Sequence, residues 1–369
     1  MKPNMDKELL EPLRNRIDKI DSEILSLVNE RAKAALAVGK LKEEHSDSNE
    51  TVAYYRPERE AQILRKLKQN NNGPLAFVDV MPIFKEIISA CLNIEKRISV
   101  AYLGPEGTFT EAAVSKHFGG AVEKNSCSSI EEVYKEVQSG RSHYGVVPVE
   151  NSTEGMVNQT LDCLLERELN ICGEIELPIH QNLMRSQKAI DAILEIRAHE
   201  QSLAQCRNWL ERNYPGVPKV AVASNAEAAR QASENFAIAA IAGQVSAAKY
   251  GLDIVHSHIE DKSDNRTRFL VLGKEHILPS GDDKTSVLVS VNNEPGALLR
   301  VLEPFQNHGI SLTRIETRPE RKGNWSYVFF IDFDGHLSEQ RVEKVLQEVG
   351  EIALNVRFLG SYPKALLQE

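Results

Sequence analysis

Several patterns that define common protein classes are missing from this chain of 369 residues. Its five cysteines are scattered without a CxxC pair, which argues against a disulfide framework and against a zinc site. The formal net charge is −9, so the composition gives no general attraction for nucleic acid. The small apolar run Phe236–Ala242 is too short to span a bilayer, and the charged first residues lack a signal-peptide core. We therefore expect a cytoplasmic, globular protein with reduced thiols and no membrane partner.

Two catalytic motifs are also missing. The segment Gly104-Pro105-Glu106-Gly107 lacks the GxGxxG spacing of a dinucleotide site, which excludes an NAD-dependent dehydrogenase. The chain has no GxSxG sequence and no convincing Ser-His-Asp order. Its length and its 41% of hydrophobic residues instead suit two or three packed domains. A small anionic substrate would have to be met by local groups of Arg and Lys.

The first block, residues 6–95, has the pattern of helices only. Apolar residues recur at spacings of four and three from Leu13 to Leu41, which predicts one amphipathic helix roughly 55 Å long. The few other helical residues of one chain cannot cover it, so we expect two protomers to bury each other's apolar seams. The elements predicted next are a break at Ser46–Asn49, a helix whose first turn holds Pro57 and a third helix that includes Phe84 and Glu95.

A row of cations lies along these helices. Arg31 is on the apolar seam, where an unpaired guanidinium is costly to bury. Lys42 leaves the same face about 16 Å further along the axis, so the two can hold both ends of a small dicarboxylate. Arg14 lies about 100° round the helix, where it can reach a partner's pocket more easily than its own. The alternative is that all are solvated residues flanking a coiled coil. A buried polar ring could be completed by Arg59, Glu60 and Glu95.

The middle block, which begins at Arg97, alternates strands and helices and is therefore α/β. Thr108 and Ser224 each precede a Glu by three residues, the capping-box spacing that opens a helix. The helical runs fall in different halves of the block, so we expect two lobes with a central cleft. Strands are predicted at Ile98–Leu103, Val146–Val149, Lys219–Ala223 and Phe269–Leu272, the first and the last of them buried.

Two short segments place polar groups at that cleft. Asn151–Thr153 follows a predicted strand and precedes a helix, a common anion site in open α/β sheets. Thr267 stands between two arginines, where its hydroxyl can meet an anion at the cleft wall. Each segment alone also fits a plain helix cap or a strand-edge threonine. His180 and His199 fit structural histidines.

The last block, from Lys284, has the order strand, helix, strand, strand, helix, strand, which is ferredoxin-like. The loop Asn292–Pro295 between the first strand and the first helix is the natural ligand loop. Gly296 would let a ligand approach the backbone there. The alternative is a ferredoxin-like domain that only dimerises.

The three blocks in this order resemble the bifunctional chorismate mutase–prephenate dehydratases of phenylalanine biosynthesis. The resemblance covers nearly the whole chain. It implies an intertwined, all-helical mutase domain at residues 1–96, a two-lobed dehydratase domain like periplasmic binding proteins at 97–275, and a ferredoxin-like ACT domain at 284–363. The motifs that carry it are Leu13-Arg14-Asn15-Arg16-Ile17, Glu30-Arg31, Gly39-Lys40-Leu41-Lys42, Pro57-Glu58-Arg59-Glu60, Tyr144-Gly145-Val146-Val147-Pro148-Val149-Glu150-Asn151-Ser152, Thr267-Arg268-Phe269, Glu294-Pro295-Gly296-Ala297-Leu298 and Glu316-Thr317-Arg318-Pro319.

The resemblance implies roles for the cationic row in turning chorismate into prephenate. Arg14 of the other protomer, Arg31 and Arg59 would hold the carboxylates. Lys42 would donate to the ether oxygen, and Glu60 would accept from the ring hydroxyl. This rearrangement needs no metal and no cofactor, because catalysis comes from holding the reactive conformer and stabilising charge on the ether oxygen.

Three of the implied mutase positions depart from the best-known bacterial pattern. Glu95 stands where that pattern has a Gln as the second donor to the ether oxygen. A carboxylate cannot donate; only the protonated acid can. We therefore expect mutase activity to fall as the pH rises, and Glu95→Gln to flatten that profile. Arg56 and Cys91, implied substrate contacts, stand where an Asp and a Ser are common.

The resemblance assigns the cleft to prephenate, which loses CO2 and its ring hydroxyl together to give phenylpyruvate. The hydroxide must leave as water, so a proton donor is required. Thr267 would be that donor or its relay, acting through a hydrogen-bonded network. Carboxylates would be held by Arg268 and by the amides of the Asn151 segment. The implied substrate contacts are Asn151, Ser152, Thr153, Arg268 and Phe269.

The family's two C-terminal motifs frame an amino-acid site between paired domains, and the ligand it implies is phenylalanine. Inhibition requires that this ligand favour one of two conformations. Thr317 replaces the usual Ser. The implied regulatory contacts are Gly296, Ala297, Leu298, Glu316, Thr317 and Arg318.

Two other interpretations stay open on the sequence alone. One is a dehydratase whose mutase block is degenerate and serves only as a dimer clamp. The other is a solute-binding or sensory protein, with two lobes and an amino-acid sensor but no chemistry. Whether prephenate is bound unchanged or consumed distinguishes them.

Overall fold

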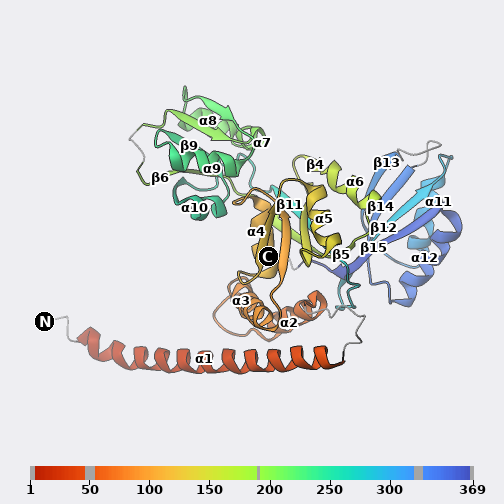
Figure 1. Ribbon diagram of the computed structural model, residues 1–369, viewed down its shortest axis with the longest axis horizontal. Coiled ribbons are helices and arrows are strands. Elements are labelled where there is room, and N and C mark those ends of the chain that lie inside the picture. The colour runs from red at the N-terminus through yellow and green to blue at the C-terminus, as the bar shows by residue number, and fades with distance from the viewer. Residues whose placement is uncertain (1–4, 46–54, 189–191, 320–326, 366–369) are drawn as a thin grey trace.

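The computed structural model describes residues 5–45, 55–188, 192–319 and 327–365. They form a group of three N-terminal helices, two α/β lobes and a C-terminal α+β domain (Figure 1). The predicted break at Ser46–Asn49 lies outside these residues. No described helix is both long enough and apolar enough to cross a membrane.

The N-terminal helices are α1 (Met5–His45), α2 (Pro57–Asn70) and α3 (Phe77–Glu95). Helix α1 runs below the rest of the molecule and packs against α3 near its C-terminal end (Figure 1). Gly39 allows this approach, because a Cβ there would stand 2.6 Å from the Cγ of Glu95. The apolar seam of α1 is uncovered, with side chains such as Ile17 and Leu27 more than half exposed.

The first lobe, lobe 1, is built on the strand order β2-β1-β3-β11-β5. The first three strands are parallel, whereas β11 runs antiparallel to both of its neighbours. The predicted cap of α4 is confirmed, since the Thr108 side chain accepts from the Glu111 amide. The elements of lobe 1 are β1 (Ser99–Leu103), α4 (Phe109–Phe118), β2 (Glu123–Cys127), α5 (Ile130–Ser139), β3 (Tyr144–Asn151), β4 (Gly155–Met156), α6 (Asn158–Glu166), β5 (Asn170–Pro178) and β11 (Arg266–Gly273).

The second lobe, lobe 2, is inserted between β5 and β11, so the chain passes between the lobes twice. Its strand order is β10-β6-β9-β7-β8. The predicted cap at Ser224 is confirmed by its bond from the Glu227 amide, 3.0 Å long. The elements of lobe 2 are β6 (Asn182–Ser186), β7 (Glu195–Ala198), α7 (Glu200–Gln205), α8 (Arg207–Asn213), β8 (Lys219–Ala221), α9 (Asn225–Glu234), β9 (Ile238–Ala242), α10 (Gln244–Tyr250) and β10 (Leu252–His256).

The C-terminal domain has the βαββαβ order predicted from the sequence. Helices α11 and α12 cover one face of its antiparallel sheet, ordered β13-β14-β12-β15, while the other face meets lobe 1 (Figure 1). Phe330 and Leu359 on that face join the same apolar core as Val147 of lobe 1. The elements are β12 (Asp283–Val291), α11 (Ala297–Asn307), β13 (Leu312–Pro319), β14 (Tyr327–Asp334), α12 (Gln340–Ile352) and β15 (Asn355–Pro363).

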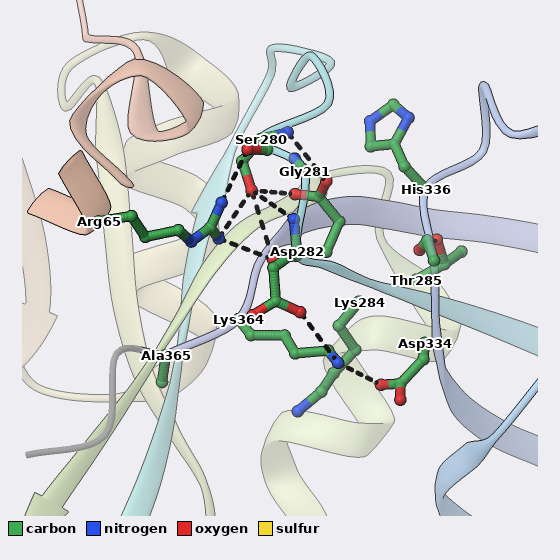
Figure 2. A network of polar contacts seen from close by, with 12 residues as sticks. Arg65, Ser280, Gly281, Asp282, Lys284, Thr285, Asp334, His336, Lys364 and Ala365 are labelled. Carbon is green, nitrogen blue, oxygen red and sulfur yellow. Dashed lines mark hydrogen bonds and ion pairs between the residues drawn. The ribbon is translucent and has the colours of Figure 1, made fainter. Parts of the chain in front are cut away.

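The N-terminal helices are joined to both other regions by specific contacts. Arg65 of α2 donates to the carbonyls of Ser280 and Asp282, over 2.7 and 2.9 Å, and so grips the linker that leads into β12 (Figure 2). Lys364 next to it pairs with Asp282 and Asp334. This arrangement, which we call the linker clasp, ties three parts of the chain together.

Tyr55, just before α2, completes the core of lobe 1. Its ring packs against Phe118 and Tyr144, and its hydroxyl meets Nε2 of His117 at 2.9 Å. Burial lowers the pKa of His117 to about 3, with the Lys85 ammonium adding to the effect. The imidazole is therefore neutral at physiological pH.

Candidate active sites

A cleft with a volume of about 390 Å³ opens between the two lobes. The first residues of α4 and α9, with their caps Thr108 and Ser224, line it from opposite lobes. Amide groups at helix N-termini attract anions. Within the described residues, no Lys or Arg side chain lines this cleft. An anionic substrate would therefore be met by backbone amides and polar side chains, with Glu154 the one carboxyl group among the described lining residues.

Asn151 and Thr267 lie side by side in the cleft, because β3 and β11 pair in that register. Asn151 Nδ2 donates to Thr267 Oγ1 over 2.8 Å. The orientation of this amide is fixed, since its Oδ1 accepts from the backbone amides of Thr153 and Glu154. Thr267 therefore accepts one hydrogen bond and keeps its own proton available for a molecule in the cleft.

A series of side-chain hydrogen bonds leads from the segment that contains Asn151 to lobe 2. Ser152 and Thr153 both donate to Asn265 Oδ1 over 3.3 Å, and Asn265 Nδ2 donates to Gln205 of α7 over 3.2 Å. Ser152 Oγ also accepts from the amide of Arg266, the first residue of β11. This side chain therefore serves mainly to hold the start of that strand in place. The sequence predicts Gln205, with His199 and Gln201, only as a further polar group of the cleft, because nothing in its local pattern marks a specific contact.

Glu154 contributes the carboxyl group of the cleft. It belongs to lobe 1, and Gln201 of lobe 2 donates to it across the opening. Burial raises the pKa of the Glu154 carboxyl, although the Gln201 hydrogen bond and His199 oppose that shift. A carboxyl group that keeps its proton at higher pH is a candidate acid, and the sequence did not single it out.

Arg268, predicted to hold a substrate carboxylate, does not line the cleft in this structure. Alternate side chains of a strand point to opposite faces, so Arg268 leaves the face opposite to Thr267. It pairs with Glu174 at 2.9 Å and with Asp332 of the C-terminal domain at 2.8 Å. Phe269 returns to the cleft side, where its ring is almost fully buried.

The predicted mutase residues are brought together only in part. Lys42 Nζ of α1 donates to Glu95 Oε1 of α3 over 3.0 Å. Glu60 pairs instead with Lys85 at 3.9 Å, and burial raises the pKa of its carboxyl group against the opposing effect of Lys85. Arg31 is half-buried. The other predicted residues are Arg14 and Arg59, which are exposed, Arg56, which meets Glu58 at 3.5 Å, and Cys91, which is buried.

The two C-terminal motifs lie on different elements. Gly296 caps α11 with φ of 78°, a left-handed conformation that glycine adopts easily, and Ala297 behind it is buried. Leu298 packs beside the domain's core. In β13, Glu316 is half-buried and Thr317 is exposed.

Two arginines of β13 form ion pairs with residues of lobe 1 that lie close to the cleft. Arg318 pairs with Asp162 at 2.5 Å and also donates to Asn158, both on α6. Arg314 pairs with Glu150 at 2.5 Å, directly beside Asn151. Strand β13 is therefore joined by side-chain contacts to the residue before Asn151 and to α6, both of which lie next to the cleft.

The fold and these sites define a regulated, multidomain enzyme for small anionic substrates. Three family models match the chain: chorismate mutase type II at residues 13–96, prephenate dehydratase at 100–277 and the ACT domain at 285–351. The chain belongs to the bifunctional chorismate mutase/prephenate dehydratase family. The resemblance seen in the motifs is thereby confirmed.

Curated relatives cover nearly the whole chain. The bifunctional chorismate mutase/prephenate dehydratase of Pseudomonas aeruginosa is 51% identical over 98% of this chain and 100% of its own length. The enzyme of the same name from Aquifex aeolicus is 47% identical with the same coverage.

Two solved structures each match nearly three quarters of the chain. A prephenate dehydratase from Arthrobacter aurescens, solved in complex with L-Phe, is 35% identical with a TM-score of 0.67 and covers 73% of this chain and 90% of its own. A structure described as the quorum quenching acylase GqqA has the same TM-score at 26% identity, covering 72% of this chain and 98% of its own. One fold thus carries more than one activity, and the roles of residues have to be argued from the site.

Proposed function

We propose that the chain converts chorismate to prephenate at its N-terminal helices and prephenate to phenylpyruvate in the cleft between the lobes. Phenylalanine, the pathway's end product, would bind the C-terminal domain and inhibit. The single observation that carries the dehydratase assignment is the Asn151–Thr267 hydrogen bond inside an anion-attracting cleft. The family membership supports both activities.

Dehydration is proposed to proceed by coupled loss of two groups. The ring carboxylate leaves as CO2, its bonding electrons enter the ring, and the hydroxyl on the opposite ring carbon leaves as water. Thr267 donates a hydrogen bond to that hydroxyl, because Asn151 occupies the acceptor side of its oxygen. Glu154 is proposed as the proton source, since its carboxyl lies in the same cleft and burial favours its protonated form.

The rearrangement of chorismate is proposed to use the Lys42–Glu95 pair. Lys42, whose Nζ lies 3.0 Å from Glu95 Oε1, stabilises the negative charge that develops on the ether oxygen. The acid form of Glu95 would add a second donor. Arg31 is half-buried on the same helix as Lys42 and would hold a carboxylate. Arg14 would reach the site of a second copy of the chain.

A homodimer interlocked through α1 is proposed from the uncovered seam. Leu13, Ile17, Ile20, Ile24 and Leu27 all stay between 44 and 63% exposed along this helix. A second copy of α1 would bury them and would also bring its Arg14 towards this chain's Lys42. A contiguous apolar face of this kind usually marks an interface.

Inhibition is proposed to act through β13. Its Arg314 and Arg318 hold Glu150 and Asp162, on either side of the Asn151–Thr153 segment. Phenylalanine bound near Gly296 and Glu316 would favour one position of β13, and these arginines would pass the change to the cleft.

The experiment that tests these proposals supplies purified protein with chorismate alone and measures prephenate and phenylpyruvate, with and without phenylalanine. Phenylpyruvate that phenylalanine suppresses is the expected result. If prephenate accumulates, the mutase assignment is supported and the proposed role of Thr267 in dehydration is wrong. Untouched chorismate, with prephenate still consumed, would favour the degenerate-mutase alternative. Glu154→Gln should slow only the dehydration step.

A further inference from the structure

Three side chains with ligand atoms meet where the chain passes between the lobes. His180 lies on the first crossing, between β5 and β6, while His258 and Glu260 lie on the second, between β10 and β11. One candidate ligand atom from each lies within 4.8 Å of the other two. In the part of the chain that the structure describes, this is the one cluster of three such groups. None of its three residues lines the cleft that holds the Asn151–Thr267 pair.

One side of the cluster is fixed. The side chain of Glu260 is only 3% exposed, and its Oε2 accepts from the Gln181 amide over 2.8 Å. Its Oε1 meets His180 Nδ1 at 2.8 Å. The carboxylate is thus held in place, with one oxygen directed at an imidazole.

The other side of the cluster can move. The His258 ring stacks on that of His180, with centroids 4.1 Å apart and planes 5° from parallel. Its residue is exposed, so the ring can turn without disturbing a core. Its backbone is fixed by its own amide, which donates to Asn182 Oδ1, and by φ of 54°.

We propose that His180, His258 and Glu260 bind a divalent transition-metal ion, most favourably Zn²⁺. Two imidazoles and one carboxylate are a common set of three protein ligands for zinc, with water as the fourth. Tetrahedral bonds of about 2.0–2.1 Å set neighbouring ligand atoms roughly 3.3 Å apart. The His180–Glu260 pair, at 2.8 Å, must therefore open slightly, and the ligand atom of His258, within 4.8 Å of the other two, can adjust by turning of its ring. Binding also releases any proton that His180 shares with Glu260.

A metal ion at this site would stiffen the two crossing segments, which form the hinge between the lobes. The two crossings are already joined by the Ile179 amide to Asn265 and by the Ile259 amide to Gln181, each over 2.9 Å. A metal held by ligands from both crossings adds a link between them and restrains rotation of one lobe against the other. This consequence rests on the proposed dehydratase function, whereas metal binding itself does not.

The first test is a titration of the full-length, chelator-treated protein with ZnCl₂ by calorimetry, with Co²⁺ absorption as a probe of four-coordinate geometry. The wild type should bind one equivalent that His258→Asn weakens by more than about 10-fold, because even partners of metal ligands contribute about 10- to 100-fold. Asn tolerates the positive φ of this position, so the variant keeps the backbone. His256→Asn, an exposed histidine two residues earlier, is the matched control and should bind as the wild type does.

Equal zinc affinity in the wild type and in His258→Asn would overturn the site. The second readout is the rate of prephenate consumption, which zinc should lower in the wild type and leave unchanged in His258→Asn. If zinc binds at His258 without changing this rate, the proposed metal site stands, but its proposed effect on the hinge is wrong. A chain that never consumes prephenate would remove the proposed function, while the titration would still decide the metal site.

Discussion

Thr267 and Arg268 are consecutive residues of β11, yet their side chains serve different parts of the molecule. Thr267 faces the cleft and meets Asn151, whereas Arg268 enters a buried cluster with Glu174 and Asp332. A substitution at each position should therefore affect different properties. One is expected to change the reaction, and the other to change the attachment of the C-terminal domain.

Arg268→Met should lower stability more than substrate binding. Removing one partner of a buried ion pair typically costs about 3–5 kcal/mol. Asp332 would stay buried without its cation, whereas Glu174 keeps Lys284 at 2.8 Å, so we expect a loss near the lower end of this range. Chemical unfolding should show this loss, while the KM for prephenate should change less than several-fold. Arg266→Met, an exposed arginine on the same strand, is the control. A stable Arg268→Met with a greatly raised KM would restore the substrate-binding role.

Thr267→Val should stop dehydration and leave the mutase step intact. The variant keeps the volume of the side chain but loses the hydroxyl, and proton-transfer groups typically contribute about 10²- to 10⁴-fold. Product analysis with chorismate should then show prephenate accumulating. Thr267→Ser, which keeps the hydroxyl beside Asn151, should retain much of the rate. Normal phenylpyruvate formation by the valine variant would refute the assignment.

Glu95→Gln should change how the mutase rate depends on pH. The wild-type rate should fall as the pH rises, because only the protonated acid can donate to the ether oxygen. The amide donates at any pH, while its oxygen can still accept from Lys42. Measurement of kcat/KM for chorismate from acid to alkaline pH compares the two profiles, with the exposed Glu44→Gln as control. A flat wild-type profile would contradict this role for Glu95.

His117 should make the fold sensitive to acid. Its pKa is about 3 in the folded protein against an ordinary value of about 6.5, so the unfolded chain takes up a proton between these values while the folded chain does not. Stability from this group is therefore complete above pH ~6.5 and is lost as the pH falls towards 3, by up to about 1.4 kcal/mol per pH unit.

The measurement for His117 is the unfolding free energy of the wild type and of His117→Gln between pH 4 and 7. The difference between the two should shrink as the pH falls, because the variant has no imidazole to protonate. His256→Gln, at an exposed site, should follow the wild type. A difference that does not change with pH would show that His117 is not buried in its neutral form.

Local signals predicted the elements well. Thr108, Ser224 and Pro57 mark helix starts because capping and the proline ring act within one turn, and all three are confirmed. The C-terminal strand and helix order followed from periodicity in the same way. The roles of the site residues stay predictions.

Side-chain partners could be predicted less well, because they depend on how distant strands pair. The face that Arg268 takes is set by the pairing of β11 with β3 and β5, including a shift in register next to Arg268 itself. Glu60 meets Lys85 only because α2 and α3 pack together. Neither contact can be recognised from the spacing of residues along the chain.

The linker clasp and Tyr55 make the N-terminal segment a structural component of the rest of the protein. A gene shortened to begin at β1 would encode a lobe without one aromatic ring of its own core and a linker without Arg65. Such a product would lose the packing of Tyr55 and the hydrogen bonds of Arg65, and should therefore be less stable than the full chain. The N-terminal helices are thus coupled to the lobes by packing as well as by the chain itself.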